Sequence, residues 1–229
     1  MNSTKKAARK AGLLYLLLVL IAPIGLMYVP SKLIVRGNAS ATANNILASQ
    51  SLFRISIVSG LVSSVIFIFL ALALYRLLQG VNRQQAVLMV ILTLVQVPLA
   101  FLNELNQIAA LTLVHGADFL GVFEKPQREA LAMLFLNLHG QGIIVTEIFW
   151  GLWLFPFGLL VFRSGFLPRF LGIWLIVNGF AYVTMSLTGL LASQYYKTVS
   201  NVAFPVLFGE MAIMLWLLIV GAKEQPLAD

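Results

Sequence analysis

Six long apolar stretches constrain the fold of this chain more than any other feature. They occupy residues 11–29, 53–78, 84–114, 129–162, 168–192 and 202–222. A helix needs about 20 apolar residues to cross the hydrocarbon core of a bilayer, because each residue advances it by about 1.5 Å. The sequence therefore predicts an all-α, polytopic transmembrane helical bundle of about six spans, forming a single domain over residues 1–229.

The third and fourth stretches are longer than one span requires, so we expect them to tilt or to project beyond the membrane as a helical hairpin. Pro98 and Pro156 lie inside them and are expected to kink their helices. Between the first two stretches, Ala39–Gln50 predicts a short surface helix with Asn38 or Ser40 as its N-cap. Small residues at helix-packing spacing predict two internal seams. These are Ser56, Gly60 and Ser64 in one stretch, and Gly172, Gly179, Ser186 and Ser193 in another.

The composition supports a membrane location and excludes several classes of function. Of 229 residues, 60% are hydrophobic and 10% are charged, whereas a soluble domain carries about 25% charged residues. The chain has no cysteine, which excludes disulfides, thiolate catalysis and cysteine-ligated metal. The net charge is +7, but the basic residues flank apolar stretches instead of forming a patch interleaved with aromatics. We therefore expect no nucleic-acid partner.

The distribution of basic residues predicts how the chain is oriented. With the N-terminus inside, nine basic residues lie in the inner segments: Lys5, Lys6, Arg9, Lys10, Arg76, Arg83, Arg163, Arg169 and Lys223. Six lie in the outer segments: Lys32, Arg36, Arg54, Lys125, Arg128 and Lys197. Because inner loops carry the excess of positive charge, we expect both chain ends in the cytoplasm. The loops at 30–52, 115–128 and 193–201 are then outside.

Polar residues within the apolar stretches are the first candidates for function, because they are costly to bury in lipid. Counting along each helix places one group near the outer interface. This group comprises Arg54, Asn103, Glu104, Gln107, Asn137, His139 and Gln141. Glu104 and Gln107 share a helix face. We favour an Arg54–Glu104 ion pair, with Glu210 or the lipid headgroups as the alternative partners of Arg54. The group is interpreted either as a ligand site or as polar contacts that hold the bundle together.

A second polar group falls near mid-membrane and comprises Gln96, Glu147, Asn178 and Glu210. Burial of a carboxyl group in a low-dielectric environment favours its neutral form. Glu147 and Glu210 therefore suit proton transfer, and equally suit interhelical hydrogen bonds to Asn178 or Gln96. The sequence does not fix the partner of either carboxyl group.

The sequence contains no motif that specifies a reaction or a cofactor. His115 and His139 are the only histidines, and membrane metallohydrolases need more ligands at close spacing, so we expect no metal. No Gly-x-Ser-x-Gly elbow and no glycine-rich phosphate loop is present. A role for His139 as general acid or base beside a carboxylate remains an alternative.

Several short strings distributed along the chain are shared with a known family. They are Ser31–Val35, Ala43–Ser49, Ser51–Arg54, Leu74–Leu78, Val81–Arg83, Leu136–Gly140, Phe162–Arg169, Gly209–Glu210 and Leu215–Leu218. Together they resemble the bacterial membrane family called domain of unknown function 4386, over about residues 7–222. The resemblance implies a multi-pass protein of the bacterial inner membrane and supplies no reaction. The family often has an acidic residue at position 137 and an aromatic residue at 141, so Asn137 and Gln141 depart from its pattern.

These observations leave three hypotheses about function. The first is a protein that binds a small hydrophobic or amphipathic molecule in an intramembrane polar pocket and moves or senses it. The second is a membrane-embedded enzyme that uses His139 with a nearby carboxylate. The third is a structural or assembly partner in which the polar groups only specify packing. Membrane lipids are the expected surroundings in each case, no cofactor is predicted, and the sequence names no protein partner.

Overall fold

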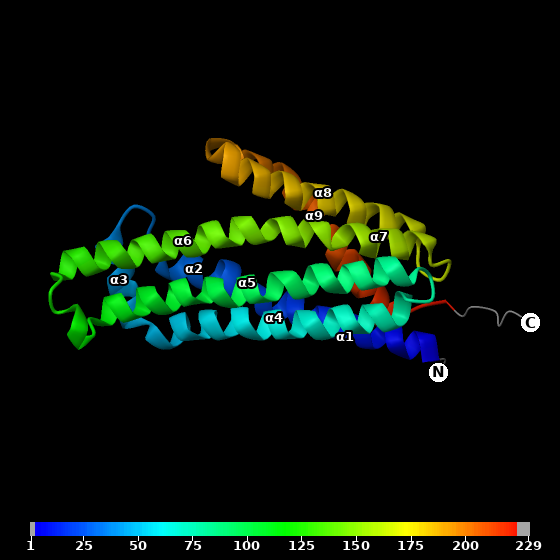
Figure 1. Cartoon of the computed structure of the whole chain (residues 1–229), viewed down its shortest axis with the longest axis horizontal. Coiled ribbons are helices and arrows are strands. Elements are labelled where there is room, and N and C mark those ends of the chain that lie inside the picture. The colour runs from blue at the N-terminus through cyan, green and yellow to red at the C-terminus, as the bar shows by residue number, and fades with distance from the viewer. Residues whose placement is uncertain (1–2, 224–229) are drawn as a thin grey trace, which may run out of the picture. The chain divides into compact units, whose positions relative to one another are not determined.

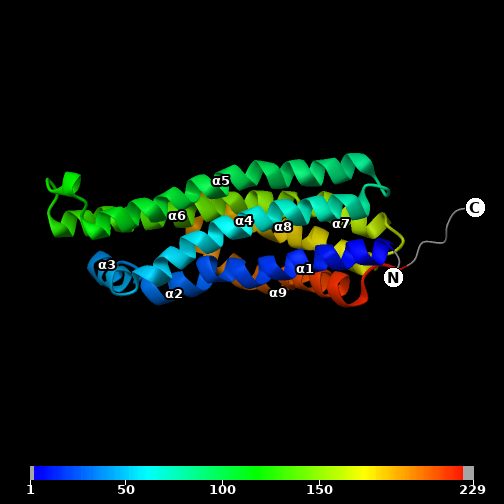
Figure 2. The same ribbon diagram turned by 90° about the horizontal axis from the view of Figure 1, so that it is seen from below.

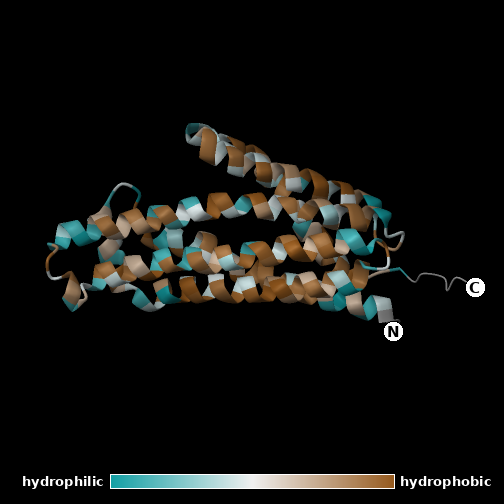
Figure 3. Ribbon diagram, viewed as in Figure 1, coloured by the Kyte–Doolittle hydropathy of each residue, from teal (hydrophilic) through white to brown (hydrophobic). Residues whose placement is uncertain are grey.

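The computed structural model describes residues 3–223, and all regular secondary structure in that part of the chain is helical (Figure 1). Six helical segments are long and apolar enough to cross a membrane, which confirms the predicted all-α, polytopic helical bundle. They run Thr4–Leu33, Gln50–Leu78, Arg83–His115, Lys125–Arg163, Arg169–Leu191 and Ser193–Val220. Each overlaps one predicted stretch, and hydrophobic residues dominate all six (Figure 3).

The spans are built mainly from α1 (Ser3–Pro23), α4 (Gln50–Leu78), α5 (Arg83–His115), α6 (Lys125–Leu152), α7 (Leu154–Arg163), α8 (Arg169–Leu191) and α9 (Tyr196–Leu215). Two short helices, α2 (Val29–Leu33) and α3 (Ala39–Ala48), follow α1. Short π or 3-10 turns complete the chain: η1 (Ile24–Tyr28), η2 (Asp118–Leu120), η3 (Ser193–Tyr195) and η4 (Trp216–Val220).

Prolines mark some of the interruptions in these helices. The fourth span breaks at Trp153, and α7 begins at Leu154, so Pro156 lies in the first turn of a helix. A proline is tolerated there because the missing N–H would have no intrahelical acceptor. A helix interruption is therefore present near Pro156, whereas α5 continues as one helix through Pro98. The predicted kinks at the two prolines stay predictions.

The predicted short helix after the first span is also present. It is α3, and its N-cap is Asn38, whose side-chain oxygen accepts a hydrogen bond from the backbone N–H of Ala41 at 2.9 Å. Capping one of the free N–H groups of the first turn stabilises a helix end. This choice decides between the two predicted caps, Asn38 and Ser40.

The chain divides into two compact units, each of which takes residues from α1, α4, α5 and α6. Within the described residues, the first unit comprises residues 3–19, Val65–Val97 and residues 144–223. The second unit comprises Leu20–Ser64 and Pro98–Ile143. The expectation of a single domain over residues 1–229 stays a prediction.

The core of the first unit is centred on the aromatic side chain of Trp153, which is almost fully buried. Its ring stacks on Phe157 at a centroid distance of 5.2 Å and meets Phe67 edge-on at 4.9 Å. Tyr15 of α1 packs against the same ring. Buried aromatic side chains of this size contribute much of a core's packing contacts.

Glycine seams bring the helices of the first unit close together. A Cβ atom added at Gly172 of α8 would lie 2.6 Å from the carbonyl oxygen of Gly158 in α7, and one at Gly179 would lie 2.9 Å from that of Gly151. Gly12 of α1 is similarly close to the backbone of Leu218 in η4, so α1 lies beside η4, the turn that follows α9 (Figure 2). The predicted seam of α8 is confirmed at these two glycines and at the buried Ser186, whereas Ser193 is exposed.

The second unit has its own apolar core, formed by α2, α3 and the adjoining parts of α4, α5 and α6. Ile46 and Phe53 are among its most buried side chains. The seam predicted in α4 also faces inward, since Ser56 is buried and Gly60 lies against α5. This core positions the polar cluster of the second unit.

Candidate functional site

The second unit contains a closed hydrogen-bonded cluster organised around Gln107 of α5. The Gln107 amide nitrogen donates to Glu104 Oε2 at 2.7 Å and to His139 Nε2 at 3.2 Å. Its amide oxygen accepts from the hydroxyl of Ser56 at 3.3 Å. One buried side chain thus joins α4, α5 and α6, and both hydrogens of its amide group are used.

The contacts of His139 determine which of its ring nitrogens carries the proton. His139 Nδ1 lies 3.2 Å from the backbone oxygen of Asn103, and a carbonyl oxygen can only accept. The pattern therefore assigns the proton to Nδ1, which leaves Nε2 free to accept from Gln107. Asn103 in turn donates from its side chain to the backbone oxygen of His139 at 3.0 Å.

Two glycines make room for this cluster. A Cβ atom added at Gly60 of α4 would collide with the carboxyl group of Glu104, and one at Gly142 of α6 would collide with the Asn103 amide. Glu104 and Asn103 therefore occupy the space that a side chain at either glycine position would need. A buried Glu104 and Gln107 hydrogen-bonded to their neighbours are the arrangement expected of polar groups that specify how helices pack.

Three of the predicted outer residues lie apart from this cluster. Arg54, Asn137 and Gln141 are exposed, whereas Asn103, Glu104, Gln107 and His139 are brought together.

The predicted Arg54–Glu104 ion pair is wrong: among residues 3–223, the one ion pair joins Lys125 and Glu129. Arg54 precedes the inward-facing Ser56 by two residues, which is about 200° of helix rotation, so it points to the opposite side of α4.

The first unit contains a different arrangement, a row of carboxyl and tyrosine side chains. Glu210 of α9 accepts a hydrogen bond from the hydroxyl of Tyr15 in α1. Tyr182 of α8 is hydrogen-bonded to the same carboxyl group. The ring of Tyr182 also meets Trp150 edge-on at a centroid distance of 5.7 Å. Three helices therefore hold the Glu210 carboxyl group.

The row continues to Glu147 near the end of α6. Glu147 Oε1 accepts a hydrogen bond from the hydroxyl of Tyr196 at 2.8 Å, and Trp150, whose ring meets Tyr182, lies three residues after Glu147 on α6. We refer to Tyr15, Glu210, Tyr182, Glu147 and Tyr196 as the carboxylate–tyrosine row. Its two acids were predicted from the sequence, and its three tyrosines were not.

The first unit also holds three side chains with buried polar atoms that have no hydrogen-bond partner among the described residues. They are Oε2 of Glu147, Oδ1 of Asn178 and both amide atoms of Gln96. All three side chains are at most 4% exposed. The amide nitrogen of Asn178 makes one long contact, 3.4 Å to the Leu207 carbonyl. Such groups are costly to bury and mark sites to examine for function.

The sequence reasoning missed the tyrosines because an aromatic residue in a span is commonly read as packing or as an interfacial anchor. A usable signal was present: Tyr15 and Tyr182 lie well inside apolar stretches, where a hydroxyl group needs a partner. The predicted alternatives, Asn178 or Gln96 as partner of either acid, are not the hydrogen bonds found.

The contacts of His139 bear on the enzyme hypothesis. Both ring nitrogens are occupied by Gln107 and Asn103, and no hydroxyl nucleophile among the described residues is hydrogen-bonded to them. No group of three potential metal-binding side chains is found within residues 3–223. The geometry around His139 therefore offers no reacting pair on which to build a catalytic mechanism.

Six membrane-length helices and a buried polar cluster in each unit define an all-α, multi-pass membrane protein. The chain belongs to the family described as Domain of unknown function (DUF4386), whose model matches residues 10–221. It is similar to an uncharacterized protein of Archaeoglobus fulgidus, with 28% identity over 168 residues covering 73% of this chain and 85% of that protein. No solved structure matches the chain.

Proposed function

We propose that this protein binds a small amphipathic molecule that carries a hydrogen-bond donor, such as a primary amine, at the carboxylate–tyrosine row of the first unit. The observation that carries the proposal is Glu147, which is 4% exposed and whose Oε2 has no partner among the described residues. A buried acceptor without a partner costs about 1–3 kcal/mol. A ligand that donates to this atom recovers that free energy.

The chemistry of the unpaired atoms defines the ligand class. Glu147 Oε2, the unpaired atom of the row, is a hydrogen-bond acceptor, so a complementary ligand must donate a hydrogen bond to it. A cationic amine is favoured over an alcohol because hydrogen bonds between charged groups are about twice as strong. The surrounding helices are apolar, so the remainder of the ligand is hydrocarbon.

The proposal includes a location and an orientation for the binding protein. We place it in the bacterial inner membrane with both chain ends in the cytoplasm, as the family resemblance and the positive-inside rule favour. Binding at a buried carboxyl group within the membrane suits either movement of the amine across the bilayer or sensing of its concentration. Other partners of the chain are ordinary membrane lipids.

The test is ligand-dependent stabilisation of the purified protein in a neutral detergent, with n-octylamine as probe and n-octanol as the matched neutral compound. At about ten times the dissociation constant, a ligand stabilises by about 1.4 kcal/mol, which corresponds to a rise in Tm of about 3–6 °C. We expect this rise with the amine in the wild type and its loss in Glu147→Gln.

Glu129→Gln is the matched control, since Glu129 is also a buried glutamate on α6 but belongs to the second unit. It should respond to n-octylamine as the wild type does. Equal shifts with amine and alcohol, or a full response in Glu147→Gln, would contradict binding at this carboxyl group.

For the polar cluster of the second unit, we propose a packing role, which its own geometry favours. The amide group of Gln107 is fully engaged, and Gly60 leaves no space beside the Glu104 carboxyl group. Gln107→Leu tests this role, because a packing role predicts that it lowers the free energy of unfolding.

A further inference from the structure

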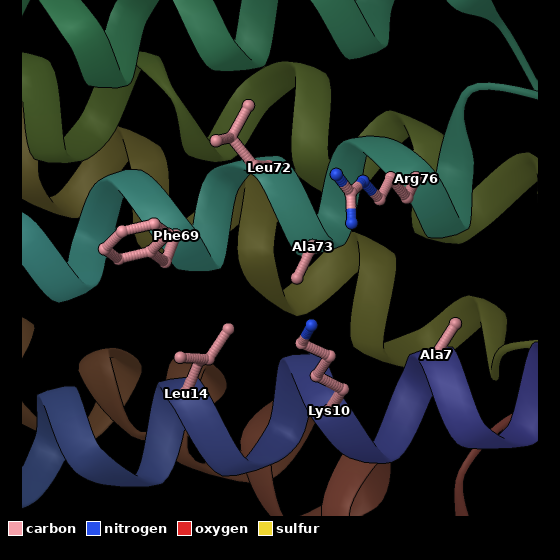
Figure 4. A pocket seen from close by; sticks show the side chains of 7 residues that line it. All are labelled: Ala7, Lys10, Leu14, Phe69, Leu72, Ala73 and Arg76. Carbon is pink, nitrogen blue, oxygen red and sulfur yellow. The ribbon is translucent and has the colours of Figure 1, made fainter.

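We propose that a groove between α1 and α4 binds an anionic phospholipid, with its phosphate held between Lys10 and Arg76. The groove lies within the first unit, has a volume of about 350 Å³ and is shown in Figure 4. Its lining residues are Ala7, Lys10, Leu14, Phe69, Leu72, Ala73 and Arg76. The site is distinct in its residues from the carboxylate–tyrosine row and does not depend on the proposed function.

The two cationic groups approach the same part of the groove from different helices. In Figure 4 the Lys10 ammonium group points from α1 toward α4, and the Arg76 guanidinium group points back along α4 toward Ala73. Ala7 and Ala73 are small, which keeps the space between the cations open. An anion placed there can contact both charges at once.

The charge of the groove is not neutralised from within the chain. None of the described residues that line it is acidic, and neither Lys10 nor Arg76 forms an ion pair with a described carboxylate. Arginine presents a planar fork of donors that matches phosphate oxygens, and lysine adds a compact positive charge. The groove is therefore complementary to a phosphate group.

The rest of the lining identifies the anion as part of a lipid. Leu14 lies one helical turn beyond Lys10, about 6 Å along α1, and Phe69 lies about 10 Å from Arg76 along α4. Phe69 and Leu72 are 56% and 40% exposed, so an apolar surface continues outward from the cations. A phosphate with an acyl chain attached covers both surfaces, whereas a soluble anion leaves the apolar part bare.

The predicted orientation agrees with this occupant. With the N-terminus inside, Lys10 and Arg76 lie at the cytoplasmic ends of their helices. Basic residues next to that membrane surface attract anionic lipids.

The experiment measures lipid retained by the full-length protein, using native mass spectrometry from detergent micelles doped with phosphatidylglycerol or phosphatidylcholine. The wild type should retain the anionic lipid and release the zwitterionic one. Each basic residue near an anionic lipid contributes close to a fivefold factor in affinity, so Lys10→Gln with Arg76→Gln should weaken binding about 30-fold.

Two further variants separate this groove from general charge. Lys6→Gln with Arg83→Gln removes the same charge from exposed residues of α1 and α5 that do not line the groove, and should retain lipid as the wild type does. Ala73→Phe keeps every charge, fills the groove and should reduce retention about as strongly as the loss of both cations.

Several outcomes would overturn the proposal. One is equal retention of the two lipids, and another is equal weakening by the control pair of substitutions. Unchanged retention in Ala73→Phe would place the lipid elsewhere. Displacement of the lipid by soluble glycerol phosphate at the same concentration would make a free phosphate, instead of a lipid, the natural occupant.

Discussion

Two glutamines on α5, one in each unit, show that equally buried amide groups can differ in their hydrogen bonding. Gln107 in the second unit is 4% exposed and Gln96 in the first unit is 2% exposed. Gln107 makes hydrogen bonds to Glu104, His139 and Ser56. Both amide atoms of Gln96 lack a partner among the described residues. Burial alone therefore does not distinguish a packing residue from a candidate binding group. The number of its polar atoms that have hydrogen-bond partners does.

The difference arises from the side chain that lies three residues before each glutamine on α5. Glu104 precedes Gln107 by three residues and so lies on the same face, where the two side chains meet. The corresponding neighbour of Gln96 is Thr93, whose hydroxyl donates to the carbonyl oxygen of Met89 at 3.1 Å. The Thr93 hydroxyl therefore has no hydrogen left to donate to Gln96 Oε1, and the Gln96 amide nitrogen makes no hydrogen bond to it or to any other described residue.

The largest effect is expected from Gln107→Leu. The substitution keeps a similar volume but leaves three polar groups of the second unit without a partner. At about 1–3 kcal/mol for each unsatisfied buried group, and without full additivity, we expect the free energy of unfolding to fall by about 3 kcal/mol. Denaturation in mixed detergent micelles measures this change.

Thr112→Val serves as the control for Gln107→Leu, because the Thr112 hydroxyl only bonds back to the Ile108 carbonyl within the same helix. It should change the free energy of unfolding by less than about 0.5 kcal/mol. A loss in Gln107→Leu no greater than that of Thr112→Val would contradict a packing role for the cluster.

Gln96→Leu should have the opposite sign and a smaller size. It removes two buried polar atoms that have no partner and replaces them with hydrocarbon of similar volume. We expect the free energy of unfolding to rise by about 1–2 kcal/mol, measured in the same micelles. A loss of stability in Gln96→Leu would show that this amide is satisfied by a molecule from outside the chain.

The fold was predictable from the sequence to a greater extent than the sites were. Span lengths and proline positions depend on local composition, and the spacing of Glu104 and Gln107 fixed their shared face. The Arg54–Glu104 pair failed because counting residues gives height along a helix but not rotation about it. The hydroxyl partners of Glu147 and Glu210 were not predicted, because they belong to residues 49 and 195 positions away in the chain.

A smaller effect on stability is expected at Arg54, because the structure places this side chain apart from the Glu104 cluster. Arg54 is exposed and forms no ion pair with a described residue. Arg54→Ala should therefore change the free energy of unfolding by less than about 0.5 kcal/mol. In a double-mutant cycle with Glu104→Gln, the two effects should add, and a coupling energy above about 0.5 kcal/mol would restore the rejected pair.

The smallest effect on stability, and the clearest distinction between the two units, is expected from single cysteines placed in a loop of each. Gly80 in the first unit and Gly121 in the second are both exposed. An added Cβ meets nothing within 4 Å at Gly80 and only the Asp118 carbonyl, at 3.3 Å, at Gly121. Because the chain has no native cysteine, every labelled thiol reports one position.

The predicted orientation puts the 115–128 loop outside and the α4–α5 turn inside. In intact cells, an impermeant maleimide should label Gly121→Cys and leave Gly80→Cys unlabelled, and permeabilisation should make both reactive. Labelling of Gly80→Cys alone would invert the orientation, and would move the Lys10 and Arg76 groove to the outer leaflet.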